Sequence, residues 1–276
     1  DLTVHEGSNF TNLGWIANLT ILGNLVNHGT VNPVNSYVTT TGNIVNTGGL
    51  YVGSGILAVG GDLGSTPMAT FNTGTGTVKF FGSAAQSVSG ALYNNLVIDK
   101  SGAAPTITVN SSSTITGTLD MVGSDTIFAM DTHDLTVVGV VNTATNNHIR
   151  FTSGNGMFHS NVTVNGDIRN TSGNITFNDD LVASSGLEVG SGTMVFATNA
   201  TTTNSCTFNM GSGIVEVYGD LDLTSAFIQK GTSILRFMGG ASQDIRPSTS
   251  AMDFAFNNIE SLKSGGTVTF SNSVNS

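Results

Sequence analysis

Charged side chains are scarce in this sequence, in which Asp, Glu, Lys and Arg make up only 9% of 276 residues, far below the roughly 25% of an ordinary soluble domain. The eight Lys and Arg residues stand singly, and the formal net charge is −10. Because phosphate binding needs clustered basic side chains, these features argue against nucleic acid as a partner. Disorder is not expected either, since Val, Ile, Leu and Phe are plentiful.

Cysteine and long apolar runs are also nearly missing. The one cysteine, Cys206, cannot form a disulfide within the chain, so we expect it to be a small buried apolar side chain. No apolar run approaches the roughly 20 residues of a membrane-spanning helix, so no membrane span is expected. The sequence does not open with a basic segment followed by an apolar run, which is the pattern of a secretory signal peptide. If the protein is exported, we therefore expect either that Asp1 follows a signal peptide that has been removed or that the sequence is a fragment.

Helical periodicity is absent as well, and strand periodicity takes its place. Apolar residues lie two apart in residues 74–82, 106–123, 161–168 and 214–221, which is the pattern of β-strands with one face inward. There are only four prolines, whereas the 35 glycines cluster with Asn, Ser and Asp between these runs, where they favour turns. The sequence predicts an all-β protein.

Repetition along the chain decides between a β-sandwich and a β-solenoid. The triplet Gly-Asp-Leu/Ile recurs at Gly61, Gly166 and Gly219, and stacked solenoid rungs repeat their corners whereas a sandwich has no reason to. At each corner we expect glycine to turn the chain, Asp to hydrogen-bond to nearby backbone, and Leu or Ile to re-enter the core. We predict one continuous parallel β-solenoid (β-helix) over residues 1–276, right-handed by default, with about 11–14 rungs of about 20–25 residues.

A longer repeat relates residues 77–110 to residues 234–270. The first copy contains VKFFGSAAQSV and then YNNLVIDKSG, and the second contains LRFMGGASQDI and then FNNIESLKSGG. The shared pattern, [VL]-x-F-x-G-x-x-x-Q-x-[VI] followed by [YF]-N-N-[LI], resembles a repeat of very long, secreted, non-enzymatic prokaryotic surface proteins. This resemblance implies a β-helix-like surface or adhesin-type protein that lies outside the cell, on its surface or in the surrounding matrix.

The two ends of the chain complement each other. The sequence stops at TVTFSNSVNS, and adding the N-terminal DLTVHEGS after it extends the match to the first copy, with Leu2 in the place of Leu119 and Val4 in the place of Met121. Both ends carry alternating strand sequence, without a helix, a Lys-rich edge or a proline that would protect an open solenoid end. Complementary uncapped ends permit a head-to-tail contact, which builds a fibre unless it closes into a ring.

We therefore predict a structural, non-enzymatic extracellular protein that assembles with itself into a filament, fibre or sheath through strand pairing between its ends. The expected junction residues are Leu2, Val4, Phe10, Val268, Phe270 and Val274. A covalent tandem array of such units would give the same pattern, and donation of the N-terminal strand into a neighbour's groove is a third route. The expected axial length of one unit is about 55–65 Å.

The alternative function is that of a solenoid stalk or adhesin module, which binds carbohydrate or a surface through a flat face rich in Thr, Ser and Asn. An enzyme would need clustered Asp, Glu, Arg or Lys on one face, which the low charge disfavours. No cofactor or metal is expected, because the carboxylates in residues 131–134, 178–180 and 219–222 lack the spacing of known metal motifs and suit polar corners.

Seven Asn-x-Ser/Thr sequons would accept N-glycans in a host that attaches them. Their number is what the Asn, Ser and Thr content alone predicts, so it carries no functional argument. The sequons begin at Asn9, Asn18, Asn110, Asn161, Asn170, Asn174 and Asn199.

Overall fold

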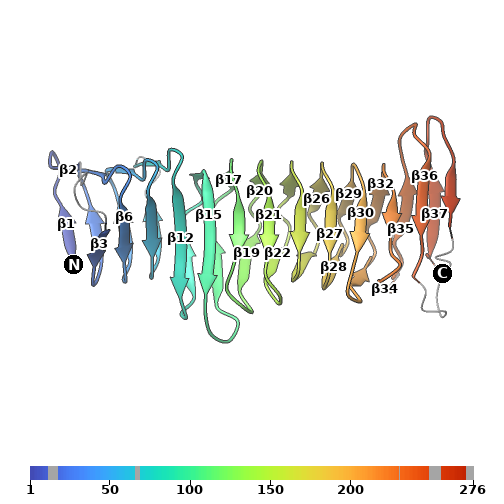
Figure 1. The fold of residues 1–276 in the computed structure, drawn as a ribbon, viewed down its shortest axis with the longest axis horizontal. Coiled ribbons are helices and arrows are strands. Elements are labelled where there is room, and N and C mark those ends of the chain that lie inside the picture. The colour runs from blue at the N-terminus through green and yellow to red at the C-terminus, as the bar shows by residue number, and fades with distance from the viewer. Residues whose placement is uncertain (12–17, 66–68, 230, 249–255, 272–276) are drawn as a thin grey trace. The chain divides into compact units, whose positions relative to one another are not determined.

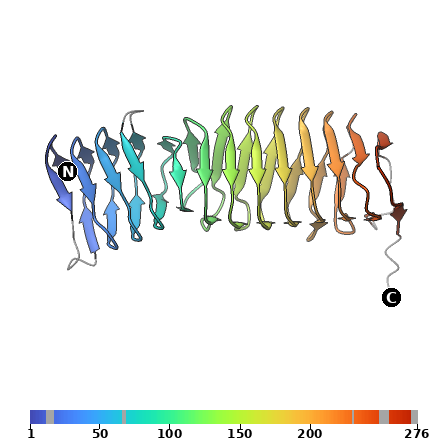
Figure 2. The ribbon, with the colours of Figure 1, turned by 90° about the horizontal axis from the view of Figure 1, so that it is seen from above.

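A computed structural model describes residues 1–11, 18–65, 69–229, 231–248 and 256–271, and the chain divides into two compact units, Asp1–Ala129 and Met130–Ser276. Each unit is a parallel β-solenoid (Figures 1 and 2). The units together hold about 12 rungs of roughly 21 residues, and no helix occurs among the described residues. The predicted all-β solenoid is confirmed, and the number of rungs lies in the predicted range.

Unit 1 winds three strands per rung, so that each strand pairs with the strand three places later. Its first sheet contains β1 (Leu2–Val4), β4 (Leu25–Asn27), β7 (Ile44–Asn46), β10 (Leu63–Ser65), β13 (Gln86–Val88), β16 (Thr106–Val109) and β19 (Ile127–Asp131). Its second contains β3 (Asn18–Ile21), β6 (Tyr37–Thr40), β9 (Ile56–Val59), β12 (Thr77–Gly82), β15 (Asn95–Lys100) and β18 (Leu119–Met121). The remaining strands are β2 (Asn9–Thr11), β5 (Thr30–Asn32), β8 (Gly49–Tyr51) and β11 (Thr70–Asn72), then the pair β14 (Leu92–Tyr93) and β17 (Ser113–Ile115).

Unit 2 has the same three-strand rung. One sheet contains β22 (His148–Phe151), β25 (Asp167–Asn170), β28 (Gly186–Glu188), β31 (Thr207–Asn209) and β34 (Phe227–Gln229). A second contains β21 (Val141–Thr143), β24 (Val162–Val164), β27 (Leu181–Ala183), β30 (Ala200–Thr202), β33 (Leu221–Asp222), β36 (Gln243–Arg246) and β38 (Val268–Phe270). The third contains β20 (Leu135–Val137), β23 (Gly156–Phe158), β26 (Asn174–Phe177), β29 (Thr193–Phe196), β32 (Ile214–Val217), β35 (Ile234–Phe237) and β37 (Asn258–Ser261).

In-register parallel pairing stacks equivalent side chains in columns through the core. Phe158 pairs with Phe177, and Phe177 pairs with Phe196. Their rings are stacked with centroids 5.2 and 5.7 Å apart, close to the rung spacing of about 4.8 Å. Alternate residues of each strand therefore build the core, and Cys206, as predicted, is fully buried within it. Burial raises the pKa of this thiol to about 12.

Asparagine and aspartate side chains connect the corners of successive rungs. The Oδ1 of Asn43 accepts the backbone N–H of Asp62 at 2.8 Å, and the Oδ1 of Asp62 accepts that of Ser87 at 2.8 Å. In unit 2, the Oδ1 of Asp220 accepts the backbone N–H of Asp244 at 2.7 Å. Asp62 and Asp220 thus hydrogen-bond to backbone of the next rung, as the triplets predict. Asp167, in the third triplet, instead accepts hydrogen bonds from the side chains of His148, Arg169 and Ser185.

The corner glycines have a different role from the predicted one. Gly61, Gly166 and Gly219 do not have positive φ values, so none of them supplies a left-handed turn. Each instead lies against the backbone of the preceding rung: a Cβ on Gly166 would stand 1.7 Å from the carbonyl oxygen of Asn147. Glycine is needed at these corners because two backbones approach too closely for any side chain.

Candidate functional site

Among the described residues of unit 2, no strand pairs with the outer side of β37 or β38, which are the edge strands of their sheets toward the C-terminus (Figure 1). Ile259, Leu262 and Phe270 are 52%, 59% and 47% exposed. A hollow of about 480 Å³ opens between the two strands, with Phe237, Val268 and Phe270 among its lining residues. We call Ile259, Leu262, Val268 and Phe270 the C-terminal end surface.

The duplicated module shows that this surface is built like the interior of a solenoid. In the first copy, β12 pairs with β15 and β13 with β16; in the second, β35 pairs with β37 and β36 with β38. The registers are the same in both copies. The matching pairs are Val78–Leu96 and Gln86–Ile107 in the first, and Leu235–Ile259 and Gln243–Val268 in the second.

The two copies differ in what covers them. In the first copy, the next rung places Leu119 on Leu96 and Phe128 on Ile107, and Leu96 and Ile107 are at most 1% exposed. Ile259, the counterpart of Leu96, is half exposed because no described strand pairs with the outer side of β37. The C-terminal end surface therefore has the residues and the register to receive another rung.

A lysine–glutamine pair recurs in both copies and is buried in the first. Lys100 Nζ donates to Gln86 Oε1 at 2.6 Å, and Lys263 Nζ donates to Gln243 Oε1 at 2.8 Å. Lys100 is only 1% exposed, and burial lowers the pKa of its ammonium group to about 8. Lys263 is half-buried, since it belongs to the uncovered end.

The lowered pKa of Lys100 predicts a pH-dependent stability. Between pH 8 and its ordinary pKa of 10.5, the unfolded chain holds the Lys100 proton more tightly than the folded chain, so the free energy of unfolding rises with pH. From pH 8 to pH 9 we expect Lys100 to contribute a rise of about 1 kcal/mol, partly offset by Cys206, whose ordinary pKa is 9.0 and whose contribution is the same in both proteins compared below. Urea unfolding should show this contribution as the difference between the pH dependence of the wild type and that of Lys100→Met. Equal slopes in both proteins would contradict it.

The predicted N-terminal junction residues fall into two groups. Leu2 and Phe10 are half-buried, while their partners on the next rung, Leu25 and Val31, are 1% and 3% exposed. Val4 is only 5% exposed, so it already belongs to the core of the first rung. A charge at Val4 would therefore destabilise that rung and would not separate assembly from folding.

At the other end, Val268 is half-buried and Phe270 exposed, and both lie on the uncovered surface. The Phe270 ring meets that of Phe237 edge-on, with centroids 6.0 Å apart. Val274 lies outside the described residues. Leu2, Phe10, Val268 and Phe270 thus remain accessible junction candidates, to which the structure adds Ile259 and Leu262.

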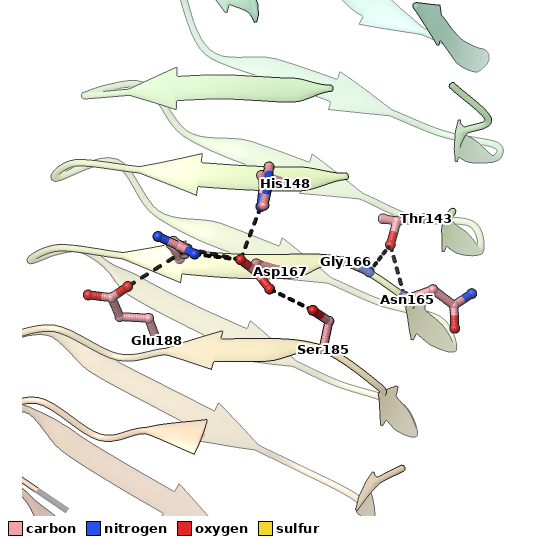
Figure 3. A network of polar contacts seen from close by, with 8 residues as sticks. Thr143, His148, Asn165, Gly166, Asp167, Ser185 and Glu188 are labelled. Atoms are coloured by element: carbon pink, nitrogen blue, oxygen red, sulfur yellow. Dashed lines mark hydrogen bonds and ion pairs between the residues drawn. The ribbon is translucent and has the colours of Figure 1, made fainter. Parts of the chain in front are cut away.

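A second candidate site is a charged cluster on the sheet that contains β22, β25 and β28 (Figure 3). Its centre is Asp167, which is only 7% exposed. Asp167 Oδ2 accepts hydrogen bonds from Arg169 Nη2 at 2.6 Å and from His148 Nδ1 at 3.1 Å, and its Oδ1 accepts one from Ser185 Oγ at 3.1 Å. Burial lowers the pKa of His148, which favours the neutral form of its ring.

The order of groups in this cluster does not make a nucleophile. In a catalytic triad the imidazole stands between the hydroxyl and the carboxylate and takes the hydroxyl proton. Here the carboxylate of Asp167 stands between Ser185 and His148, and Figure 3 shows no hydrogen bond between the imidazole and the Ser185 hydroxyl. The arrangement can hold polar groups in place and offer hydrogen bonds to a ligand.

The carboxylates considered as metal or catalytic candidates lie at corners. Asp134 Oδ1 accepts the backbone N–H of Asn155 at 2.8 Å, Asp180 Oδ1 that of Asn199 at 3.2 Å, and Asp222 Oδ1 that of Thr224 at 3.0 Å. Within the described ranges, no group of three or more His, Cys, Asp or Glu side chains is arranged to hold a metal ion. The described residues contain no helix that is long and apolar enough to span a membrane.

The predicted glycosylation residues differ in accessibility. Asn170 is 1% exposed, and its side-chain nitrogen donates to the carbonyl oxygen of Gly173, so attaching a glycan after folding would require this corner to open. The other six are exposed: Asn9, Asn18, Asn110, Asn161, Asn174 and Asn199.

No protein-family model matches the chain, and neither a curated protein nor a solved structure matches it. The β-solenoid fold therefore rests on the structure itself. The resemblance to repeats of prokaryotic surface proteins stays a prediction.

Sequence reasoning missed the cluster around Asp167. His148, Asp167 and Gly186 are 19 residues apart in succession, as are Arg150, Arg169 and Glu188. Writing the sequence in rows of 19 residues would have placed these charged residues above one another. The rungs of this chain differ in length, however, because paired positions such as Leu96 and Leu119 are 23 residues apart. Without the rung length, distant charges cannot be placed on one face.

Proposed function

We propose that this chain is an extracellular structural protein that assembles head to tail, the C-terminal end surface of one copy receiving the first rung of the next. One observation carries the proposal: the second module copy exposes residues whose counterparts in the first copy, in the same register, are buried by a following rung. Burying a large apolar side chain contributes about 1.5–3 kcal/mol, so several of them support a stable junction.

The first module copy also supplies the register of the junction. There, Leu96 faces Leu119 and Val97 faces Asp120. Because Leu2 occupies the place of Leu119 in the sequence match, Leu2 of the next copy faces Ile259, and Thr3 faces Glu260. Phe10, on the second strand of that first rung, is then expected to lie over β38, just as β19 lies over β16, the counterpart of β38, in the first copy. The contact is heterologous and repeats without limit unless it closes into a ring.

Disulfide cross-linking tests this register. Facing Cα atoms on neighbouring parallel strands are about 4.8 Å apart, which is within the range that a disulfide bridges. A protein carrying Thr3→Cys mixed with one carrying Glu260→Cys should form a disulfide between copies under mild oxidation. The control pairs Thr3→Cys with Met157→Cys, which is exposed on a lateral sheet face. Cross-linking no greater than in this control would overturn the junction.

A covalent tandem array would bury the same surfaces within one chain. A protein with two copies of the sequence joined from Ser276 to Asp1 should then unfold at a higher temperature than the single chain under conditions where the single chain is monomeric. The disulfide between Thr3→Cys and Glu260→Cys on separate chains distinguishes noncovalent assembly from a covalent tandem array, because it forms only if separate chains meet at the junction. Both forms would join copies end to end in one extended structure.

A further inference from the structure

A polar groove crosses one face of unit 2 next to the Asp167 cluster. The outward-facing residues of β25, β28, β31 and β34 form two columns, because these strands pair in register. The first column contains Asp167, Gly186, Thr207 and Phe227, and the second contains Arg169, Glu188, Asn209 and Gln229. Because Gly186 has no side chain, the first column is interrupted, and a hollow of about 420 Å³ opens there.

The groove combines buried and exposed hydrogen-bonding groups. Asp167 forms part of the lining, and its carboxylate is held by His148, Arg169 and Ser185, as Figure 3 shows for the labelled residues. Glu188, Thr207, Asn209 and Gln229 also line the hollow. Carboxylates accept hydrogen bonds, guanidinium groups donate them, and amides and hydroxyls do both. Such a mixture suits a ligand whose groups also both donate and accept, as sugar hydroxyls do.

An exposed aromatic ring lies on β34, one strand beyond Thr207 of the groove; it does not itself line the hollow. Phe227 is 59% exposed and faces Thr207 in the sheet register. An aromatic face presents a flat apolar surface, against which the C–H face of a sugar ring can pack while its hydroxyls contact polar neighbours.

The charges of the groove nearly cancel. Asp167 and Glu188 carry negative charge, and Arg169 and Arg150 carry positive charge on adjacent positions of the same sheet. Two further titratable groups lie near Asp167, and burial favours the uncharged form of both: it lowers the pKa of His148 and raises the pKa of the Cys206 thiol. No excess charge of one sign is present to select an acidic or a basic ligand.

From these observations we infer that the groove over Gly186 is a binding site for an uncharged oligosaccharide that lies across successive rungs, from Phe227 toward Asp167. The hollow has the size of small-ligand sites. Its polar groups recur at the rung spacing of about 4.8 Å, so an extended chain of sugars fits better than a single ring. This binding is independent of the proposed assembly, since the groove and the C-terminal end surface share no lining residue.

Isothermal titration of the full chain with cellohexaose, maltohexaose and xylohexaose tests the inference, with hexagalacturonate and a chitosan hexamer as charged comparisons. At least one neutral sugar should bind. Phe227→Ala should weaken that binding at least about tenfold, and so should Gly186→Ala, whose Cβ would stand 2.5 Å from Asp167 Oδ1. Tyr218→Ala, at a 37% exposed aromatic residue outside the groove, should leave binding unchanged.

Three outcomes would overturn the site. The first is the absence of binding by any neutral oligosaccharide, and the second is binding of the charged sugars alone. The third is neutral binding that Phe227→Ala and Gly186→Ala leave unchanged. Circular dichroism of both variants, expected to match the wild type, separates loss of the site from loss of the fold.

Discussion

Ile259→Asp is expected to prevent assembly while leaving the fold of the single chain intact. Ile259 is 52% exposed in the separate chain, so a carboxylate there stays hydrated until another rung covers it. In the proposed junction the same carboxylate would be buried opposite Leu2 without a partner. Such burial costs at least about 3 kcal/mol, which corresponds to a roughly 100-fold higher concentration for assembly.

Light scattering across a concentration series measures this effect, and thermal unfolding monitors the fold. The matched control is Met157→Asp, which introduces the same charge at a 43% exposed apolar residue on a lateral face and should assemble like the wild type. Leu262→Asp, at 59% exposure, provides a second variant on the end surface. If Ile259→Asp and Leu262→Asp assembled as readily as the control, the C-terminal end surface would not be the junction.

Gly192→Ala should be among the most destabilising substitutions in the chain. A Cβ at this position would stand 1.7 Å from the carbonyl oxygen of Gly173, and Gly173 itself lies in the same way against Gly154. The three glycines form a column in which backbone rests directly on backbone, so the rungs of unit 2 would have to separate. We expect a loss of about 3 kcal/mol or more in the free energy of unfolding.

Gly64→Ala is the control for this substitution. Gly64 does not have a positive φ value, and the nearest atom to an added Cβ is the Ile44 carbonyl oxygen at 3.7 Å, an ordinary contact. Urea unfolding should show a change within about 0.5 kcal/mol for Gly64→Ala. A similarly small change for Gly192→Ala would show that the rungs tolerate a side chain at this corner.

The sequence predicts the solenoid because its evidence is local and repeated. Alternating apolar residues define the strands, and repeated triplets such as Gly61-Asp62-Leu63 locate the corners. The reason for the glycines was not predictable in the same way. Whether Gly166 turns the chain or admits a neighbouring backbone depends on the residue stacked beneath it, and sequence spacing alone does not identify Asn147 as that residue.

The end surface was only partly predictable. The sequence match placed Phe270 and Val268 at the junction, but Ile259 and Leu262 became candidates only when their exposure could be compared with the first module copy. Val4 illustrates the opposite case. It looks like any alternating residue of an end strand, yet the neighbouring rung already buries it. The exposure of a side chain at the end of a solenoid depends on which strands lie next to it, and the alternation of apolar residues in the sequence carries no information about those strands.

Electron microscopy of the purified chain, without added ligand, tests the central claim most directly. Head-to-tail stacking predicts filaments with an axial repeat of about 55–65 Å, the length expected for the rungs of one copy, and predicts their loss in Ile259→Asp. Separate particles of single-chain size at every concentration would contradict noncovalent head-to-tail assembly.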